Sequence, residues 1–518
     1  MVAIVSGNGV GLSNSSLALL GQGGILGDAQ QGRSLDRVYV NAATGNLAIQ
    51  RADEGLAGSG PDISVVRTYN SLGVLANDFD NQDLWLPGLY KKVYGLTGTV
   101  NTAGSTITRR DADGTEIVYT YNTTAAAYIA TDGDGAHDTL SYAASVWTWT
   151  DGSSRFTETY DDTNGGRITA RKDTDLNALT YTYNASGYIS QVTSANGEIT
   201  YFDYTGAKLT QVRTVTSGGT VTSTRVRYGY DASNRLSTVT VDLSPGDNSI
   251  ADAKIYVTTY TYDSTSNRVA SITQSDGSRI DFAYTLVGSD YRLTQVTQDP
   301  LGLNRITGIA YNTGTRTTTI TDPLGQATVL TYDTSNRLLS VTGPAVGGVS
   351  QVVSYAYDGS GNVSQVTDAR GNVTVYQYDA NGNRTLERDA AGNTVTRTFS
   401  TTNQVLTQTV YVVPDPDGAG AGQPGTPATT RYAYDGENHL RFVVSGEGAV
   451  SESRYNTAGL RIQSIQYNVA LYNLGALLPT DPISESTLAT WTQSQDKTDT
   501  AVIDYSYDVR GQLATATR

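Results

Sequence analysis

The sequence predicts an all-β protein built as one continuous strip of antiparallel β-hairpins. A turn motif, D-x-x-G-N, recurs every 10 or 11 residues and begins at Asp358, Asp368, Asp379 and Asp389. About six residues remain between turns, which is the length of a typical strand. The chain also contains 35 Tyr but only 6 Phe among 518 residues. That preference favours flat rings with a polar end on a half-exposed sheet.

The turn residues explain why the chain reverses at these positions. Each Asp can accept hydrogen bonds from nearby backbone N–H groups, and each Gly can adopt the left-handed conformation of a tight turn. We therefore expect a positive φ at Gly382. Asn takes the place of the turn Gly at Asn234 and Asn336, and Asn also tolerates that conformation.

The larger period is one hairpin of 21 residues, as from Tyr357 to Tyr378. Tyr-x-Tyr clusters followed by Asp or Asn begin at Tyr119, Tyr181, Tyr228, Tyr260, Tyr355, Tyr376, Tyr432 and Tyr505. From residue 106 to residue 518 this period leaves room for about twenty hairpins. Because strands twist against their neighbours, so long a strip must coil into a spiral, partial shell. Nothing in the sequence identifies a segment that would plug it.

Three stretches interrupt the period. Residues 1–37 are Gly-rich at their start and are expected to be irregular. Residues 411–429 hold four of the twelve prolines and predict a protruding loop. Residues 466–500 lack turn signals and predict an insertion.

One short helix is expected near residues 481–495, inside the last of these stretches. Asp481 and Pro482 form a typical helix start. Ile483, Leu488 and Trp491 would then share one apolar face.

Charge and composition exclude several classes of function. The chain has 35 basic and 50 acidic residues, a net charge of −15, which disfavours nucleic acid and anionic membranes as partners. It has no cysteine, which excludes disulfides, thiolate catalysis and cysteine-ligated metals. No apolar run is long enough for a membrane helix, and the first residues lack the early positive charge of a secretory signal peptide.

No catalytic motif stands out, and we expect no enzymatic activity, no cofactor and no catalytic, cofactor-binding or metal-ligating residues. The motifs of nucleotide-binding loops, serine hydrolases and zinc proteases are absent. Of the two histidines, His439 follows a turn at a position where other repeats carry Arg or Asn. We expect it to be an ordinary repeat residue, whose replacement by Gln changes stability by less than about 0.5 kcal/mol.

Two acidic stretches raise the question of calcium, which prefers oxygen ligands. One contains Asp132, Asp134 and Asp138 beside His137. The spacing lacks the fifth-position ligand and the later bidentate Glu of a calcium loop, so a Gly/Asp turn is favoured and calcium stays open. The other contains Asp111, Asp113 and Glu116, where a hairpin turn is again favoured.

The repeated pattern Y-x-Y-D-x-x-G-N resembles the YD repeats of the RHS family. The segments Val38–Gln50 and Gly60–Ser71 resemble the region that precedes the repeats in bacterial RHS proteins. The resemblance divides the chain into residues 1–37, a pre-repeat region 38–105 and a YD-repeat strip 106–518. Members that release a C-terminal toxin carry a terminal core signature, which the final repeat YSYDVRGQLATATR does not show. Fragments of that signature at Asp299–Gly302 and Asp322–Gly325 fit the turn rhythm and are expected to be ordinary turns.

The resemblance implies a non-catalytic scaffold: a shell that encloses or presents a toxin polypeptide in bacterial secretion or competition. The alternative is a cell-surface adhesion module that binds glycans or proteins, as implied by other members of the family. Expected partners are a C-terminal cargo or the remaining repeats of a longer parent chain, or a glycan or protein receptor, with no nucleic acid and no membrane insertion. The implied location is secreted or cell-surface, without a Sec signal peptide in this chain.

Overall fold

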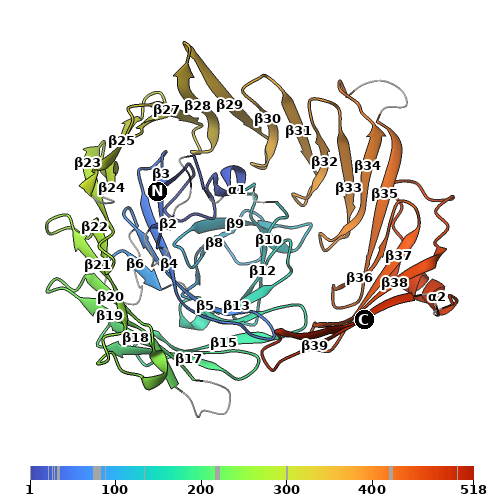
Figure 1. Ribbon diagram of the computed structural model, residues 1–518, viewed down its shortest axis with the longest axis horizontal. Coiled ribbons are helices and arrows are strands. Elements are labelled where there is room, and N and C mark those ends of the chain that lie inside the picture. The colour runs from blue at the N-terminus through green and yellow to red at the C-terminus, as the bar shows by residue number, and fades with distance from the viewer. Residues whose placement is uncertain are drawn as a thin grey trace.

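The computed structural model describes residues 2–21, 23–25, 27, 30–31, 36–73, 83–87, 89–133, 135–215, 222–298, 302–418, 424–496, 498 and 500–518. Strands make up 54% of the protein and helices 4%, which confirms the all-β prediction. Within the described residues, no helix is both long and apolar enough to cross a membrane. One long antiparallel sheet, the strip, winds around a smaller inner sheet that contains the N-terminus (Figure 1).

The strip is a succession of hairpins in which each strand pairs with the next along the chain. Its first part comprises β7 (Lys92–Thr97), β8 (Thr106–Arg110), β9 (Glu116–Asn122), β10 (Ala127–Ile129), β11 (Thr139–Ala143), β12 (Val146–Thr150), β13 (Thr157–Asp161), β14 (Arg167–Lys172), β15 (Ala178–Tyr183), β16 (Ile189–Thr193), β17 (Ile199–Thr205) and β18 (Lys208–Val215). Its middle part comprises β19 (Thr222–Tyr230), β20 (Leu236–Asp242), β21 (Ile255–Tyr262), β22 (Val269–Gln274), β23 (Arg279–Val287), β24 (Asp290–Gln298), β25 (Arg305–Asn312), β26 (Thr317–Thr321), β27 (Ala327–Tyr332) and β28 (Leu338–Val346).

The last part of the strip continues the same order. It comprises β29 (Val349–Tyr357), β30 (Val363–Thr367), β31 (Val373–Tyr378), β32 (Arg384–Arg388), β33 (Thr394–Phe399), β34 (Val405–Val413), β35 (Gly425–Tyr434), β36 (Leu440–Val444), β37 (Ala449–Tyr455), β38 (Arg461–Leu471), β39 (Thr500–Tyr507) and β40 (Leu513–Thr517). All five residues of β40 are exposed. Short 3-10 helices lie at Asp162–Asn164 and Pro245–Asp247.

The strip begins earlier than the expected residue 106, with a small barrel formed by strands β7 to β14. Strand β14 pairs with β15 and also with β7, where Arg167 lies opposite Lys92. The backbone N–H of Val93 donates to the Gly166 carbonyl at 2.8 Å. The barrel core is aromatic and contains Tyr119, Tyr128, Trp147, Trp149 and Tyr160. The barrel closes by pairing residues about 75 positions apart in the sequence. The 21-residue period predicts pairing of neighbouring strands only, so it could not predict this closure.

The N-terminal region forms the inner sheet, although its Gly-rich start was expected to be irregular. Its strands are β1 (Ala3–Val5), β2 (Gln30–Gln31), β3 (Asp36–Asn41), β4 (Leu47–Leu56), β5 (Ile63–Asn70) and β6 (Trp85–Pro87), in the order β1-β3-β4-β5-β6 with β2 beside β3. Ile4, Val40 and Ile49 are fully buried in one core with Ile280 and Leu330 of the strip. Burial of apolar side chains against a distant part of the chain thus orders the N-terminal strand and fills space inside the strip.

The expected short helix is present as α2 (Glu485–Gln493), but the start predicted at Asp481 and Pro482 is wrong, because the Ser484 side chain supplies the cap. A second helix, α1 (Leu17–Leu20), lies near the N-terminus. Ser484 caps α2 by accepting a hydrogen bond from the backbone N–H of Thr487. Ile483 and Leu488 are buried and Trp491 packs beside them, in a core with Phe442 and other residues of the strip.

The Pro-rich stretch 411–429 extends one hairpin, β34 to β35, and residues 419–423 lie outside the described part. Asp415 within it turns back onto the strip. Its backbone N–H donates to the Gly392 carbonyl at 2.8 Å, and its carboxylate lies 3.5 Å from Arg388.

The D-x-x-G-N turns have the expected chemistry. In the turn from Asp358 to Asn362, one carboxylate oxygen of Asp358 accepts from the backbone N–H groups of Ser360 and Asn362. The other accepts from the Asn362 amide at 3.0 Å. The turn glycine Gly382 has φ +82°, and Asn234 and Asn336 have φ 64° and 62°, which confirms the three left-handed positions.

Tyrosine is preferred over phenylalanine because its hydroxyl joins successive hairpins. The hydroxyl of Tyr378 donates to the Val363 carbonyl at 2.9 Å. Val363 lies opposite Tyr357, where the ladder shifts register, and such bulges disrupt the regular backbone pairing. The same bond to a backbone carbonyl recurs at Tyr183, Tyr204, Tyr230, Tyr262, Tyr284, Tyr311, Tyr357, Tyr434, Tyr455 and Tyr507.

Tyr378→Phe is expected to lower the free energy of unfolding by about 0.5–1.5 kcal/mol, since one hydrogen bond is lost and the ring is kept. Tyr376→Phe is the matched control, because among the described residues the Tyr376 hydroxyl has no hydrogen-bond partner. Urea titrations of both variants measure the difference. Equal losses would show that the hydroxyl bond does not stabilise the repeat.

Candidate functional site: the inner wall of the strip

The face of the strip that points toward the N-terminal sheet, here called the inner wall, is the most extensive candidate surface. Between β19 and β28 it is apolar and buried. Its side chains include Val226, Val239, Ile272, Ile280, Phe282, Val296, Ile309, Ile320 and Leu330. This part of the wall already holds one polypeptide layer, the inner sheet.

The same face continues beyond the part that the inner sheet covers. Leu330 lies opposite Val341, and Val341 lies opposite Val353. In the next hairpin Tyr355 lies opposite Val366. Because directly opposed residues point to the same side of a sheet, the register carries the inner wall into β29 and β30.

The character of the wall changes in this second part. Thr374 lies opposite Val366, and Tyr376 lies opposite Glu387. Every residue of β30 is only half-buried, and so are all residues of β31 except the exposed Gln377. The wall therefore passes from a dry apolar surface to a mixed surface of aromatic, polar and charged groups.

A cavity of about 280 Å³ lies where the inner sheet stops covering the wall. On one side it is lined by the N-terminal segment around Ser13 and Ser16. On the other it is lined by Tyr357, Tyr376 and Arg384 of the strip. The guanidinium of Arg384 lies 5.2 Å from the centre of the Tyr376 ring. This lining offers stacking and hydrogen bonding, but no paired catalytic groups.

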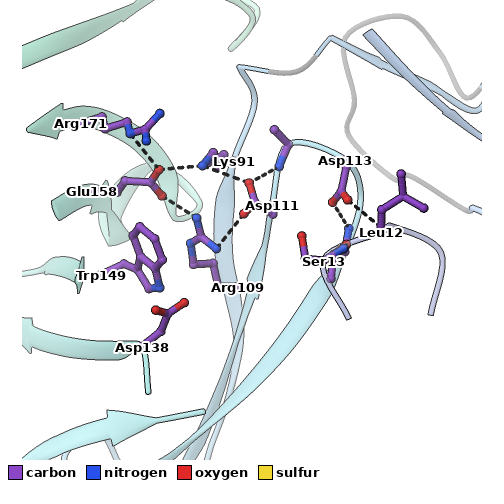
Figure 2. Close-up of polar contacts among 12 residues, drawn as sticks. Leu12, Ser13, Lys91, Arg109, Asp111, Asp113, Asp138, Trp149, Glu158 and Arg171 are labelled. Carbon is purple, nitrogen blue, oxygen red and sulfur yellow. Dashed lines mark hydrogen bonds and ion pairs between the residues drawn. The ribbon is translucent and has the colours of Figure 1, made fainter. Parts of the chain in front are cut away.

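A buried ionic cluster lies in the small barrel (Figure 2). Arg109 is 1% exposed and lies 2.7 Å from Glu158 and 3.2 Å from Asp111. Lys91 bridges the same two carboxylates at 2.7 Å and 3.0 Å. The Arg109 guanidinium also lies 4.0 Å from the Trp149 ring centre. Arg171 adds a third cation, 4.0 Å from Glu158, so each buried carboxylate faces at least two cations, and pairing of this kind is the condition for burying charge.

The cations in this cluster keep both acids ionised. Burial alone would raise the pKa of Glu158, but Lys91 and Arg109 outweigh it and lower the pKa to about 2. The pKa of Asp111 is lowered in the same way, against burial, by Arg109 and Lys91. Acids held this firmly ionised are poor proton donors, so the cluster is suited to stability rather than to acid catalysis.

Asp138 differs from its neighbours, because burial raises its pKa to about 7 against the opposing hydrogen bond from the Gly152 N–H. For an acid with a raised folded-state pKa, stability is lost as the pH rises from 3.8 through 7. Asp138→Asn keeps an oxygen for Gly152 and removes the charge. The variant is expected to gain about 1–3 kcal/mol at pH 8 and little at pH 4.

Chemical denaturation of wild type and Asp138→Asn at both pH values tests this expectation. Asp161→Asn serves as the opposite case, because hydrogen bonds from Thr163 and Asn164 lower the pKa of Asp161, so this variant should lose stability at pH 8. A gain at pH 4 as large as that at pH 8 would contradict the assignment.

The acidic residues considered for calcium are engaged elsewhere in the structure. Asp111 is in the ionic cluster, Asp113 accepts from the backbone N–H of Leu12 at 2.7 Å, and Glu116 pairs with Arg110 at 3.1 Å. The backbone bond from Asp111 N–H to the Thr115 carbonyl confirms a hairpin turn.

The other calcium candidate is only partly described. Asp134 lies outside the described residues, and Asp138 accepts from Gly152. Within the described residues, Asp132 and Asp138 do not belong to any group of three that brings its ligand atoms together.

His137 occupies a contact between the small barrel and the later strip. It is 9% exposed, and its backbone N–H donates to the Asn381 carbonyl at 2.7 Å. Among the described residues its Nε2 has no hydrogen-bond partner. Burial lowers its pKa, although Asp132, Asp379 and Asp358 act in the opposite direction. The buried His137 ring therefore has a structural role, which is to fill the contact between the barrel loop and the turn at residues 379–383.

His439 is more than the ordinary repeat residue expected from the sequence. Its Nδ1 lies 3.1 Å from Asp435, where other repeats place an Asn amide or an Arg. Its Nε2, however, lies 2.9 Å from Asp175, 264 positions away. Local sequence could not reveal this partner, because the contact exists only when the strip has curved back on itself.

His439, Asp435 and Glu437 form the one group in the described part of the chain whose ligand atoms could together hold a metal ion. Both ring nitrogens of His439 already face carboxylates. His439 therefore pairs with Asp435 inside its own turn and with Asp175 in a distant turn, and these pairs explain why the carboxylates lie close to the ring.

Comparison with known proteins supports the interpretation of the repeat. A family model described as RHS Repeat matches residues 357–394. No curated protein matches the chain. Of the solved structures, TcdB2-TccC3 overlaps with 93% of this chain at 13% identity and a TM-score of 0.31. The Tc holotoxin pore of Photorhabdus luminescens overlaps with 91% of it at 12% identity and a TM-score of 0.31.

The chain spans 30% and 26% of the length of those two structures. The matched repeat does coincide with the strands and turns from Tyr357 to Thr394, which have the regular turn geometry described above.

Proposed function

We propose that this chain, an RHS/YD-repeat protein, is a non-catalytic scaffold whose inner wall encloses or presents a polypeptide. The observation that carries the proposal is the continuity of the wall. One register runs from Leu330 to Tyr376, yet the inner sheet covers only its first part. The remaining wall is half-buried and chemically mixed. Such a surface suits a polypeptide with no single required sequence, since it offers hydrogen bonds, aromatic rings and both signs of charge.

The partners and the location follow from the same proposal. The occupant would be a C-terminal cargo or further repeats of a longer parent chain. Enclosure of a toxin for bacterial secretion or competition is the role that the RHS resemblance implies, with the protein secreted or at the cell surface. The division into residues 1–37, 38–105 and 106–518 belongs to this proposal as well.

A tail-protection experiment tests enclosure. An unfolded polypeptide is appended after Arg518, and its digestion by a broad-specificity protease is compared with that of the free peptide. Enclosure predicts slower digestion of the attached tail. A tail digested as fast as the free peptide would contradict enclosure and favour presentation on the outside.

Because the chain has no cysteine, single cysteines can report which face the tail contacts. Thr374→Cys lies on the inner wall, and Val375→Cys is its neighbour on the opposite face of β31. A thiol-reactive crosslinker in the tail should capture residue 374 and not residue 375. Equal capture would overturn the assignment of the inner wall.

The adhesion alternative is favoured by a different observation, the exposed apolar hairpin tips. Val346 and Val349 on the β28–β29 hairpin are 79% and 70% exposed, and Val412 on the β34–β35 hairpin is 69% exposed. Val346 and Val349 lie opposite each other on one hairpin and offer a small apolar contact surface. Binding to a glycan array or to cells that is lost in Val346→Ser/Val349→Ser, with the tail unprotected, would support adhesion.

A further inference from the structure

The later strip meets the earlier strip along a line of turns, here called the seam. It joins the turns at residues 173–177 and 194–198 to the turns at residues 435–439, 456–460 and 508–512. In Figure 1 the red C-terminal strands reach the teal and green strands there. The contacts are side-chain bonds between turns, so they are separable from the backbone ladder of the strip.

Three pairs of residues are bonded across the seam. Arg510 donates to Glu198 at 2.9 Å. The side-chain amide of Asn177 donates to the Ala458 carbonyl at 3.2 Å. His439 Nε2 lies 2.9 Å from Asp175. Of these, only the third has a side chain that changes charge near neutral pH without a large perturbation.

His439 is held in a fixed geometry between two carboxylates. Nδ1 faces Asp435 of its own turn and Nε2 faces Asp175 across the seam. The ring stacks on Tyr455, with centroids 4.4 Å apart and planes at 21°. With both nitrogens facing oxygen acceptors, only the doubly protonated ring can donate both hydrogen bonds.

The other groups around His439 add negative charge. Glu437 of the same turn has a carboxylate oxygen within 4.8 Å of the His439 and Asp435 ligand atoms. Asp173, at the start of the opposite turn, accepts from the backbone N–H groups of Asp175 and Asn177. Tyr455 is the neighbour on the stacking side. A neutral ring would therefore leave carboxylates facing one another across the seam.

We propose that the seam is a proton-operated clasp, closed when His439 is protonated and loosened when it is neutral. Loss of one ring proton turns a donor into a lone pair that faces a carboxylate. It also removes the only cation between Asp175 and Asp435 among their described bonding partners. The clasp therefore holds the early and late turns together in acid and releases them as the pH rises.

Loosening of the clasp as the pH rises agrees with the direction in which the pKa of His439 is shifted. Burial would lower the pKa of His439, but its hydrogen bonds to Asp175 and Asp435 outweigh burial and raise the pKa. A histidine with a raised folded-state pKa contributes fully below its unfolded value near 6.5. That contribution is lost as the pH rises through the folded value.

The repeats themselves supply matched variants. Arg235 and Arg337 occupy the corresponding position of other turns, each with its Nε donating to the turn Asp. Asn362 and Asn383 occupy it in two more, with the amide donating to the turn Asp. His439→Arg should keep the turn and a permanent positive charge at the seam. His439→Asn should keep the turn and lose the bond to Asp175.

Hydrogen exchange of the peptides that contain residues 173–177 and 435–439 tests the clasp. Rates are measured at pH 5.5 and 8.5 and corrected for the intrinsic effect of pH. In wild type we expect exchange about tenfold faster at pH 8.5 than at pH 5.5, because the neutral ring no longer bridges Asp175 and Asp435. His439→Arg should change by less than about twofold between the two pH values, and His439→Asn should be fast at both.

The contact between His137 and Asn381 provides an internal reference, since burial lowers the pKa of His137 and this contact would respond to acid in the other direction. Peptides from the turn at residues 368–372 report global effects. If wild type and His439→Asn have the same pH profile at residues 173–177, or if His439→Arg keeps the wild-type profile, the clasp is wrong. Neither result bears on whether the inner wall encloses a polypeptide.

Discussion

Arg109→Met is expected to lower the free energy of unfolding by about 3–5 kcal/mol. The methionine fills much of the volume but leaves Lys91 as the one close cation for both Glu158 and Asp111 among the described residues, and Glu158 has no exposed side-chain surface. The bond from Arg109 Nε to the Tyr160 hydroxyl, 2.9 Å long, is lost as well. Removing one partner of a buried ion pair is costly because the remaining charge stays out of water. Trp147 and Trp149 lie in the same barrel, so denaturant titration followed by tryptophan fluorescence reports the loss.

Arg213→Met is the matched control at the surface. Arg213 and Asp203 form an equally close pair at 2.5 Å, but both side chains are about a third exposed. Its loss should cost less than about 1 kcal/mol. If the two variants lose the same stability, burial is not what makes the Arg109 cluster important.

Restoring charge balance should recover part of the loss. In the double variant Arg109→Met/Glu158→Gln neither side chain is charged, so its destabilisation should be smaller than the sum of the two single effects. The lowered pKa of Glu158 also predicts a pH dependence. Its contribution is present above the unfolded value near 4.5 and is lost as the pH falls through about 2. Additive single effects would argue against direct coupling of Arg109 and Glu158.

Gly382→Val is the second large effect, with an expected loss of about 2–4 kcal/mol. Two causes combine at this turn. The backbone has φ +82°, where a β-branched residue is strained. A Cβ would also lie 2.2 Å from the Gly135 carbonyl oxygen and 2.7 Å from the His137 ring, so the barrel loop would have to move. Thermal and urea unfolding measure the total.

Gly371→Val separates the two causes. Gly371 occupies the same place in the preceding turn, with φ +83°, and its Cβ would meet nothing within 4 Å. It should show the strain alone, about 1–3 kcal/mol. If Gly371→Val is as destabilising as Gly382→Val, the contact between the turn and the barrel loop contributes no stability.

The sequence by itself determined the local architecture. The spacing of Asp358, Asp368, Asp379 and Asp389 located the turns, and the conformations of Gly382, Asn234 and Asn336 followed from residue type. These features are readable because a turn is built from residues within five positions of one another. The presence of the short helix near residues 481–495 was readable for the same reason, because Leu488 and Trp491 lie on one local apolar face. Its start was not, since the predicted start at Asp481 and Pro482 lies before the actual cap, Ser484.

The tertiary structure alone decided which distant segments meet. The N-terminal strand is ordered by Ile280 and Leu330, the small barrel closes between Val93 and Gly166, and His439 finds Asp175 across the seam. Each contact depends on how far the strip curves, and curvature accumulates from a small twist at every strand. Each repeat specifies nearly the same small rotation between neighbouring strands. The position at which the strip meets itself depends on the whole strip. The distant partners, Asn381 of His137, Asp175 of His439 and Glu158 of Arg109, therefore had no signature in the local sequence.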